Sequence, residues 1–195
     1  MSIKVSIDAS GGDFGFPVTI NAGINALKAY DDLLVNFVGD QTGIEKELKN
    51  NALSSKFLSR IEITHASEVI NMDDSPSVAL RHKKDSSMRV AINLVKNGDA
   101  DACVSAGNTG ALMSIARFVL KTISGVDRPA IMSAVPTLTG PTHVLDLGAN
   151  IDSKPSTLLQ FAIMGSIAVQ NTENIESPSV GLLNVGTEEL KGNEK

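Results

Sequence analysis

The chain has 195 residues, of which 42% are hydrophobic, so it is long enough to bury the core of an α/β domain. Its 17 basic and 22 acidic residues give a formal net charge of −5, which argues against a general nucleic-acid or anionic-membrane surface. The single cysteine excludes an internal disulfide, and the residues around it do not have the spacing of metal ligands. No segment has the apolar length of a signal peptide or of a membrane span, which favours a cytoplasmic protein.

Short β-branched runs alternate with helical patterns in the first part of the chain, which predicts an α/β fold with a mostly parallel sheet. Three of these runs are predicted strands: residues 3–8, 33–38 and 60–65. Pro17 stands at the first position of the helix expected after the first strand, and a polar helix around residues 44–53 is expected after the second.

The next part of the chain contains two helices, a strand and a third helix. Residues 75–84 are predicted to form a short helix begun by Ser75, and Ser86 or Ser87 caps the following helix. Residues 102–106 carry no charge, as expected for a buried parallel strand. A helical pattern resumes after the sequence GNTG.

The last part of the chain adds a hairpin to this pattern. Residues 131–135 and 143–148 are joined by a turn-rich connector, which predicts an antiparallel pair that interrupts the sheet. Residues 158–169 are apolar almost all round, as in a buried helix, and 179–185 are predicted to be a buried strand. We therefore expect a mostly parallel, doubly wound Rossmann-like sheet with one antiparallel hairpin, in a single α/β domain of residues 1–195 that is incomplete at its C-terminus.

Four loops, DASGGDFGFP, SAGNTGA, DLGANIDSKP and NVGTEELKG, each follow an apolar predicted strand. Loops at the carboxyl ends of parallel strands share one edge of the sheet, where ligands bind in α/β proteins. Two of the four open directly into helices, whose first amides attract anions. Taken singly, each loop's glycines are explained by a tight turn; taken together, the loops predict one composite anion site. The loop-forming residues are Asp8, Gly11, Gly12, Asp13, Gly148, Asn150, Gly186 and Glu188.

Other kinds of site have weaker signals. The chain has neither the GxxxxGK[ST] phosphate loop nor the GxGxxG dinucleotide fingerprint, so a nucleotide-dependent dehydrogenase is a minority alternative. Asp40 stands where a ribose-binding acid would, although a helix N-cap is the commoner role of such a residue. Cys103 is predicted to be an inert core residue, and His65 and His143 to be structural.

The segment RHKKDSSMR, residues 81–89, is basic in an otherwise acidic chain. It is either a solvated surface or a docking patch for an acidic partner. Its basic residues are Arg81, Lys83, Lys84 and Arg89.

The segments DASGGDFGFP, MDDSPSVALRHKKDSSM, VSAGNTGALM, LDLGANIDSKPSTLLQFA and GLLNVGTEELKGNE together resemble the PlsX family, the acyl-acyl-carrier-protein:phosphate acyltransferases of bacterial phospholipid synthesis. The matches run in order along essentially the whole chain. The resemblance implies that inorganic phosphate attacks the thioester of a fatty acyl chain on acyl carrier protein. The acyl phosphate then passes to a membrane-bound glycerol-3-phosphate acyltransferase.

The resemblance also implies a fold similar to phosphotransacetylases and to the isocitrate/isopropylmalate dehydrogenase type, a homodimer, no redox cofactor, and peripheral membrane association through a part of the fold beyond this chain. The family's chains are longer, so we expect this one to be truncated, and a non-catalytic binding fragment is the alternative.

Given the reaction that the resemblance implies, the positions of residues in the four loops suggest roles for some of them. The phosphate cradle is expected at Asn108 and Thr109, with Ser105 and the backbone of Gly107 and Gly110. Charge neutralisation is expected from Lys154 and Lys191, and proton handling or donor orientation from Asp8, Asp13 or Asp152. Because acyl carrier proteins are strongly acidic, the basic segment is the expected docking patch.

Overall fold

The computed structural model describes residues 2–150, 152–183 and 186, and it divides after Lys121 into two compact units. Each unit is described by itself below. The prediction of a single domain over residues 1–195 stays a prediction.

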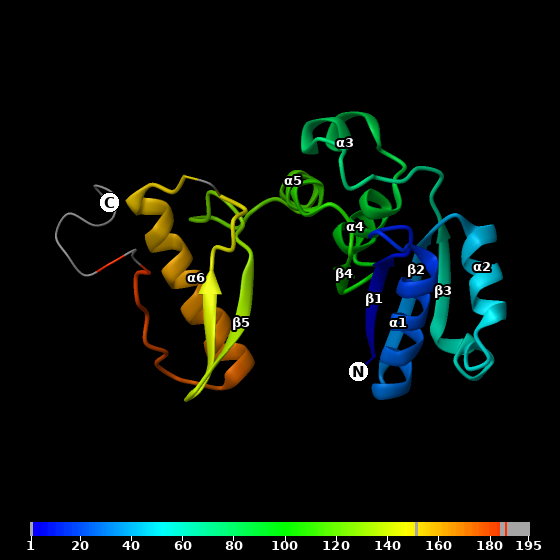
Figure 1. Cartoon of the computed structure of the whole chain (residues 1–195), viewed down its shortest axis with the longest axis horizontal. Helices are drawn as coiled ribbons and strands as arrows, with labels where there is room; N and C mark the ends of the chain where they lie inside the picture. The colour runs from blue at the N-terminus through cyan, green and yellow to red at the C-terminus, as the bar shows by residue number, and fades with distance from the viewer. Residues whose placement is uncertain (1, 151, 184–185, 187–195) are drawn as a thin grey trace. The chain divides into compact units, whose positions relative to one another are not determined.

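The N-terminal unit contains a four-stranded, fully parallel sheet in the order β3-β2-β1-β4 (Figure 1). Its strands are β1 (Ile3–Asp8), β2 (Leu33–Gly39), β3 (Ile61–His65) and β4 (Ala102–Val104). The chain adds β2 and β3 on one side of β1 and then returns to place β4 on the other side. The parallel α/β sheet predicted from the alternating pattern is confirmed.

Helices cover both faces of this sheet, as expected for a doubly wound arrangement. Successive side chains of a strand point to opposite faces. Phe37 of β2 packs with the buried residues of α1 (Phe16–Ala29) and α2 (Gln41–Asn50), whereas its neighbour Val38 packs with Ala91 of α4 (Ser87–Asn97). The core therefore lies in two layers, one on each side of the strands.

Short polar side chains cap the first turns of α2, α3 (Pro76–His82), α4 and α5 (Thr109–Leu120), whereas α1 and α6 (Pro155–Glu173) begin without a side-chain cap. Asp40 accepts a hydrogen bond from the amide of Gly43 in α2, and Ser75 and Ser86 cap α3 and α4 in the same way. α5 begins inside the GNTG sequence, two residues earlier than predicted. α2 ends at Asn50, earlier than predicted, and two short 3₁₀ turns lead to β3: Ser54–Lys56 and Leu58–Arg60.

The prediction that residues 102–106 form a buried strand is wrong in part. Only Ala102–Val104 is a strand, and Val104 is 54% exposed. The reason is the position of β4 at the end of the strand order, where it pairs with β1 alone among the described residues. The absence of charge in a strand does not distinguish an edge from a centre.

The C-terminal unit contains an antiparallel pair, β5 (Met132–Thr137) and β6 (Gly140–Leu145), with α6 (Pro155–Glu173) packed against β6. The predicted hairpin is confirmed. It does not interrupt the parallel sheet, however, because these two strands form a separate two-stranded sheet within the described residues. The connector residues themselves pair as strand, so only Leu138 and Thr139 form the turn.

Two predictions of burial in this unit are wrong. α6 buries Phe161 but exposes Leu159 and Ile163. Residues 179–183 form no strand, and Leu182 and Leu183 are exposed; Asn184 and Val185 lie outside the described residues. A strand needs a neighbour to satisfy its backbone groups, and the described residues offer this segment none. In the described part of the chain, no helix has the length and apolar character needed to cross a bilayer.

Candidate functional site

The strand order reverses between β1 and β4, and the loops that follow these two strands meet at their carboxyl ends. Asp8 is the last residue of β1, and Ser105 follows β4 directly. In doubly wound sheets, ligands bind in the crevice outside the strands at such a reversal. The first two of the four predicted loops therefore come together where a site is expected.

A buried carboxylate joins the two loops. Asp8 is 2% exposed, and its Oδ2 accepts a hydrogen bond of 2.7 Å from Ser105 Oγ. Since the hydroxyl proton of Ser105 points to Asp8, its oxygen is available to accept a hydrogen bond of 3.0 Å from the amide of Gly107. The other oxygen of Asp8, Oδ1, is buried and has no hydrogen-bond partner among the described residues. Asp8 thus fixes the conformation of the loop after β4.

The glycines of these loops permit this close approach. A Cβ atom on Gly11 would lie 2.5 Å from Asp8 Oδ2 and 3.1 Å from the amide nitrogen of Gly107. Gly12 has a φ of 85° and lies against Ala106, where a Cβ would meet the carbonyl oxygen at 3.2 Å. The two loops would have to separate if either position carried a side chain.

Asn108 forms the N-cap of α5, and its Oδ1 accepts a hydrogen bond of 2.9 Å from the amide of Ala111. The next two amides, those of Thr109 and Gly110, donate no hydrogen bond within the described residues. Unpaired amides in the first turn carry the positive end of the helix dipole. The first turn of α5 can therefore accept an anion.

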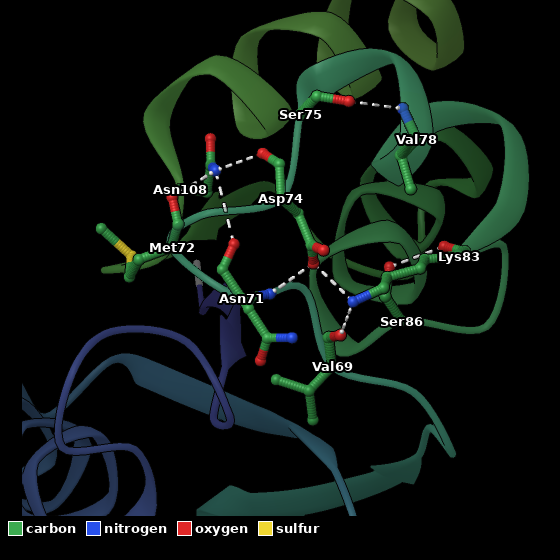
Figure 2. A network of polar contacts seen from close by, with 9 residues as sticks. All are labelled: Val69, Asn71, Met72, Asp74, Ser75, Val78, Lys83, Ser86 and Asn108. Atoms are coloured by element: carbon green, nitrogen blue, oxygen red, sulfur yellow. Dashed lines mark hydrogen bonds and ion pairs between the residues drawn. The ribbon is translucent and has the colours of Figure 1, made fainter.

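The side-chain amide of Asn108 has a second task. Its Nδ2 donates hydrogen bonds of 2.9 Å to the carbonyl oxygens of Met72 and Asp74, with a longer one of 3.4 Å to Asn71 (Figure 2). Asn108 thus ties the segment before α3 to the start of α5. The side chain of Asn108 is thus bonded to other parts of the chain. The predicted contact between Asn108 and phosphate stays a prediction, and the backbone amide is the group of Asn108 that could make it.

The segment of residues 69–75 reaches the site through Asn108. Its last four residues belong to a segment that carries the family resemblance, but the sequence alone assigned Asp74 no role in the site. Within residues 69–75, Asp74 forms an ion pair with Lys83, and Lys83 Nζ also donates to the carbonyl oxygen of Val69 at 2.8 Å. The hydrogen bond from Lys83, together with one of 2.7 Å from the amide of Asn71, holds the pKa of Asp74 below its usual value. Asp74 and Lys83 are nine positions apart, which is not a helical spacing, so the sequence did not predict their ion pair.

The basic residues of the 81–89 segment have different environments. Arg81 and Lys84 are exposed, while Lys83 is engaged with Asp74. The guanidinium of Arg89 lies 5.3 Å from the centre of the Phe118 ring in α5. Of the four predicted docking residues, Arg81 and Lys84 are exposed, whereas Lys83 and Arg89 are half-buried.

The loop after β6, in the C-terminal unit, is organised by Asp146. Its carboxylate accepts hydrogen bonds from the amides of Ile131 at 2.8 Å and Asn150 at 2.6 Å. Burial raises the pKa of Asp146, but these hydrogen bonds together outweigh that effect and the pKa lies below its usual value. Asn150 also donates to the carbonyl oxygen of Pro129 at 3.1 Å, so this predicted loop residue holds the turn in place.

The remaining predicted residues of this unit are placed only in part. Lys154 is exposed at the N-cap position of α6, as its place before Pro155 predicts. Gly148 has a φ of 87°, which favours glycine. Asp152 and Gly186 are described, but Lys191 and Glu188 lie outside the described residues.

The weaker candidates have structural roles. Asp40 is the N-cap of α2. Burial raises the pKa of the Cys103 thiol to about 11, so it is not a thiolate at neutral pH. His65 Nδ1 accepts a hydrogen bond of 3.3 Å from the amide of Gln41, and His143 Nε2 lies 3.5 Å from Glu173 Oε1.

Comparisons with known proteins agree with the resemblance. The family model described as "Fatty acid synthesis protein" matches residues 3–195. Proteins named phosphate acyltransferase from Vesicomyosocius okutanii and Ruthia magnifica are 66% and 65% identical over the whole chain, and one from Legionella pneumophila strain Paris is 56% identical. The chain spans 56–57% of the length of these relatives. It belongs to the PlsX family of fatty acid synthesis proteins, whose curated relatives bear the name phosphate acyltransferase.

Proposed function

We propose that this chain is part of an enzyme that transfers a fatty acyl group from the thioester of acyl carrier protein to inorganic phosphate. The products are an acyl phosphate and the free carrier thiol. The proposal is supported by the name of its relatives and by one observation above all: two glycine-containing loops meet at the strand reversal beside the unpaired first-turn amides of α5. That arrangement suits an anion of the size of phosphate.

The proposed reaction needs no nucleophile from the protein. An oxygen of hydrogen phosphate attacks the thioester carbonyl carbon and forms the new C–O bond. The C–S bond breaks, and the carrier sulfur leaves and takes up the proton that the hydrogen phosphate gives up. Phosphate is already nucleophilic at neutral pH, so the protein has to position it and to donate hydrogen bonds to the developing oxyanion. A half-buried Cys103 whose raised pKa keeps the thiol protonated is consistent with such a mechanism.

Roles for individual residues follow from their positions. The amides of Thr109 and Gly110 are the proposed phosphate cradle, while the amide of Gly107 donates to Ser105 Oγ and helps to shape the loop. Ser105 acts through the loop conformation, because its hydroxyl proton is used by Asp8. Lys154, Lys191 and Asp152 belong to the C-terminal part of the chain, and their roles in charge neutralisation and proton handling remain proposals from their positions in the loops.

The function is tested by mixing acylated carrier protein with phosphate and measuring acyl phosphate and free thiol. The assay is run on this chain and on a chain extended to the length of its relatives. We expect equal amounts of the two products from the longer chain. Thiol release without acyl phosphate would indicate a hydrolase, and no release at all from the longer chain would reject the proposal. Activity in the longer chain alone would identify the present chain as a non-catalytic fragment.

A charge-reversal experiment tests the docking patch. The double substitution Arg81→Glu and Lys84→Glu is expected to raise the KM for acylated carrier protein several-fold, because both side chains are exposed and the partner is acidic. The increase should be larger at low salt, where surface charges are screened less. The KM for phosphate is the internal control and should not change. An unchanged carrier KM at low salt would remove these residues from the docking surface.

The wider assembly is also a proposal. The resemblance supports a cytoplasmic homodimer that associates peripherally with the membrane and hands its product to a glycerol-3-phosphate acyltransferase. Molecular mass in solution and sedimentation with vesicles, measured on the longer chain, test these two properties separately.

A further inference from the structure

The segment of residues 69–75 is held in place by bonds from Lys83 and Asn108, and its own Asp74 takes part in both sets of bonds (Figure 2). Asp74 lies within the segment, Lys83 directly follows α3, and Asn108 caps α5. We call them the Asn108–Asp74–Lys83 network. None of the three is used by the proposed chemistry through a contact of its side chain with substrate, so their arrangement needs a separate explanation.

Asp74 links the two ends of this network. Its main-chain carbonyl accepts the hydrogen bond of 2.9 Å from Asn108, and its carboxylate forms the ion pair with Lys83. The carboxylate also accepts the hydrogen bond from the amide of Asn71, while Lys83 reaches the carbonyl oxygen of Val69. Both ends of the segment are therefore bonded to Lys83 or Asn108.

The segment and α5 are also in direct contact. A Cβ on Gly110 would lie 2.8 Å from Pro76 Cγ, so the start of α3 packs on the first turn of α5. Lys83 is held in turn by Ser86, whose hydroxyl donates to the Lys83 carbonyl oxygen at 2.8 Å and caps α4. A shift of the segment would consequently displace the turn that carries the amides of Thr109 and Gly110.

We propose that Lys83 and Asp74 are positioning residues for the phosphate site, acting through Asn108 on the first turn of α5. This inference rests on the proposed function. Lys83 has a second effect, because it neutralises a carboxylate whose own backbone is bonded to the N-cap of α5. Without Lys83, that negative charge would oppose the binding of an anion at the same helix start. Lys83 therefore works within the protein, whereas Arg81 and Lys84 remain the proposed docking residues.

The test measures the KM values for phosphate and for acylated carrier protein, in the chain extended to the length of its relatives. In Lys83→Met, we expect the KM for phosphate to rise roughly tenfold or more, because small displacements at a site have large kinetic effects. The KM for carrier protein should change less than twofold. Lys96→Met, which removes an exposed lysine of α4, is the matched control and should leave both values unchanged.

A double-mutant comparison separates the ion pair from other effects. Asp74→Asn removes the charge but keeps an acceptor for the Asn71 amide, so we expect a smaller increase in the KM for phosphate. Adding Asp74→Asn to Lys83→Met should reduce the defect of the single Lys83 variant, since the unpaired charge is then absent. If the KM for phosphate of the double variant equals that of Lys83→Met, or exceeds it by the defect of Asp74→Asn, the electrostatic part of the proposal is wrong.

Two further outcomes decide the proposal. If Lys83→Met raises the carrier KM and leaves the phosphate KM unchanged, Lys83 is a docking contact and the inference fails while the proposed function stands. If the unsubstituted protein makes no acyl phosphate, the proposed function fails, and amide hydrogen exchange then tests the network alone. Faster exchange in Lys83→Met, both in residues 69–75 and in the first turn of α5, would support the coupling; exchange equal to that of the unsubstituted protein would overturn it.

Discussion

Replacing Asn108 with alanine is expected to reduce acyl phosphate formation by roughly a hundredfold, because the first turn of α5 loses the bonds that fix its position. The free energy of unfolding should fall by about 2 kcal/mol, since the substitution removes a helix cap and leaves the carbonyl oxygens of Met72 and Asp74 without their donor. Turnover in the longer chain and urea unfolding measure the two effects.

Asn108→Ser separates the two tasks of this side chain. A serine oxygen can still cap α5, but it is too short to replace the amide donor that reaches Met72 and Asp74. We expect this variant to regain the part of the stability that comes from the cap while its turnover stays low. Full activity in Asn108→Ala would show that the fixed position of this turn is not needed for catalysis.

Substituting Gly11 with alanine is expected to have the next largest effect. The new methyl group would lie 2.5 Å from Asp8 Oδ2, and Asp8 cannot move away without breaking its bond to Ser105. Overpacking of this kind costs about 1–3 kcal/mol of stability. Because the loops after β1 and β4 would separate, the KM for phosphate should rise together with the loss of stability. Thermal unfolding and phosphate kinetics are the measurements.

Gly165→Ala in α6 is the matched control for the change from glycine to alanine. Apart from its chain neighbours and the nearby backbone of its own helix, no atom of the described residues lies within 4 Å of the position that its Cβ would occupy. This variant should be more stable by about 0.5–1 kcal/mol, since alanine is the better helix former. A Gly11→Ala protein as stable as this control would contradict the close contact between the two loops.

The predictions that succeeded concern features set by nearby residues. The first three strands, the antiparallel hairpin and the caps at Ser75 and Ser86 follow from runs and spacings within a few positions. The sequence also predicted that the loops after β1 and β4 lie at one edge of the sheet, because loops after parallel strands share an edge. The reversal of the strand order between them came from the structure. The chain could therefore reveal its α/β class and the place of a candidate site.

The predictions of burial failed where they depended on partners that the sequence does not specify. The uncharged β4 lies at the sheet edge, α6 is apolar on sides that are exposed, and residues 179–183 form no strand. In each case, apolar composition indicated a tendency to be covered without indicating what covers it. Whether a side chain is buried depends on which other residues pack against it, and the tertiary fold decides which residues these are.

By itself, the sequence determined the family, the order of strands and helices, and the glycines that allow two loops to approach. Only the tertiary structure decided what the polar side chains do. Asp8 and Ser105 are 97 positions apart and meet because β1 and β4 are adjacent. Lys83 was predicted to contact acyl carrier protein. In the structure, α3 brings the chain back so that the ammonium group of Lys83 reaches Asp74. A charge in a sequence has no defined partner until the backbone brings an opposite charge within hydrogen-bonding distance.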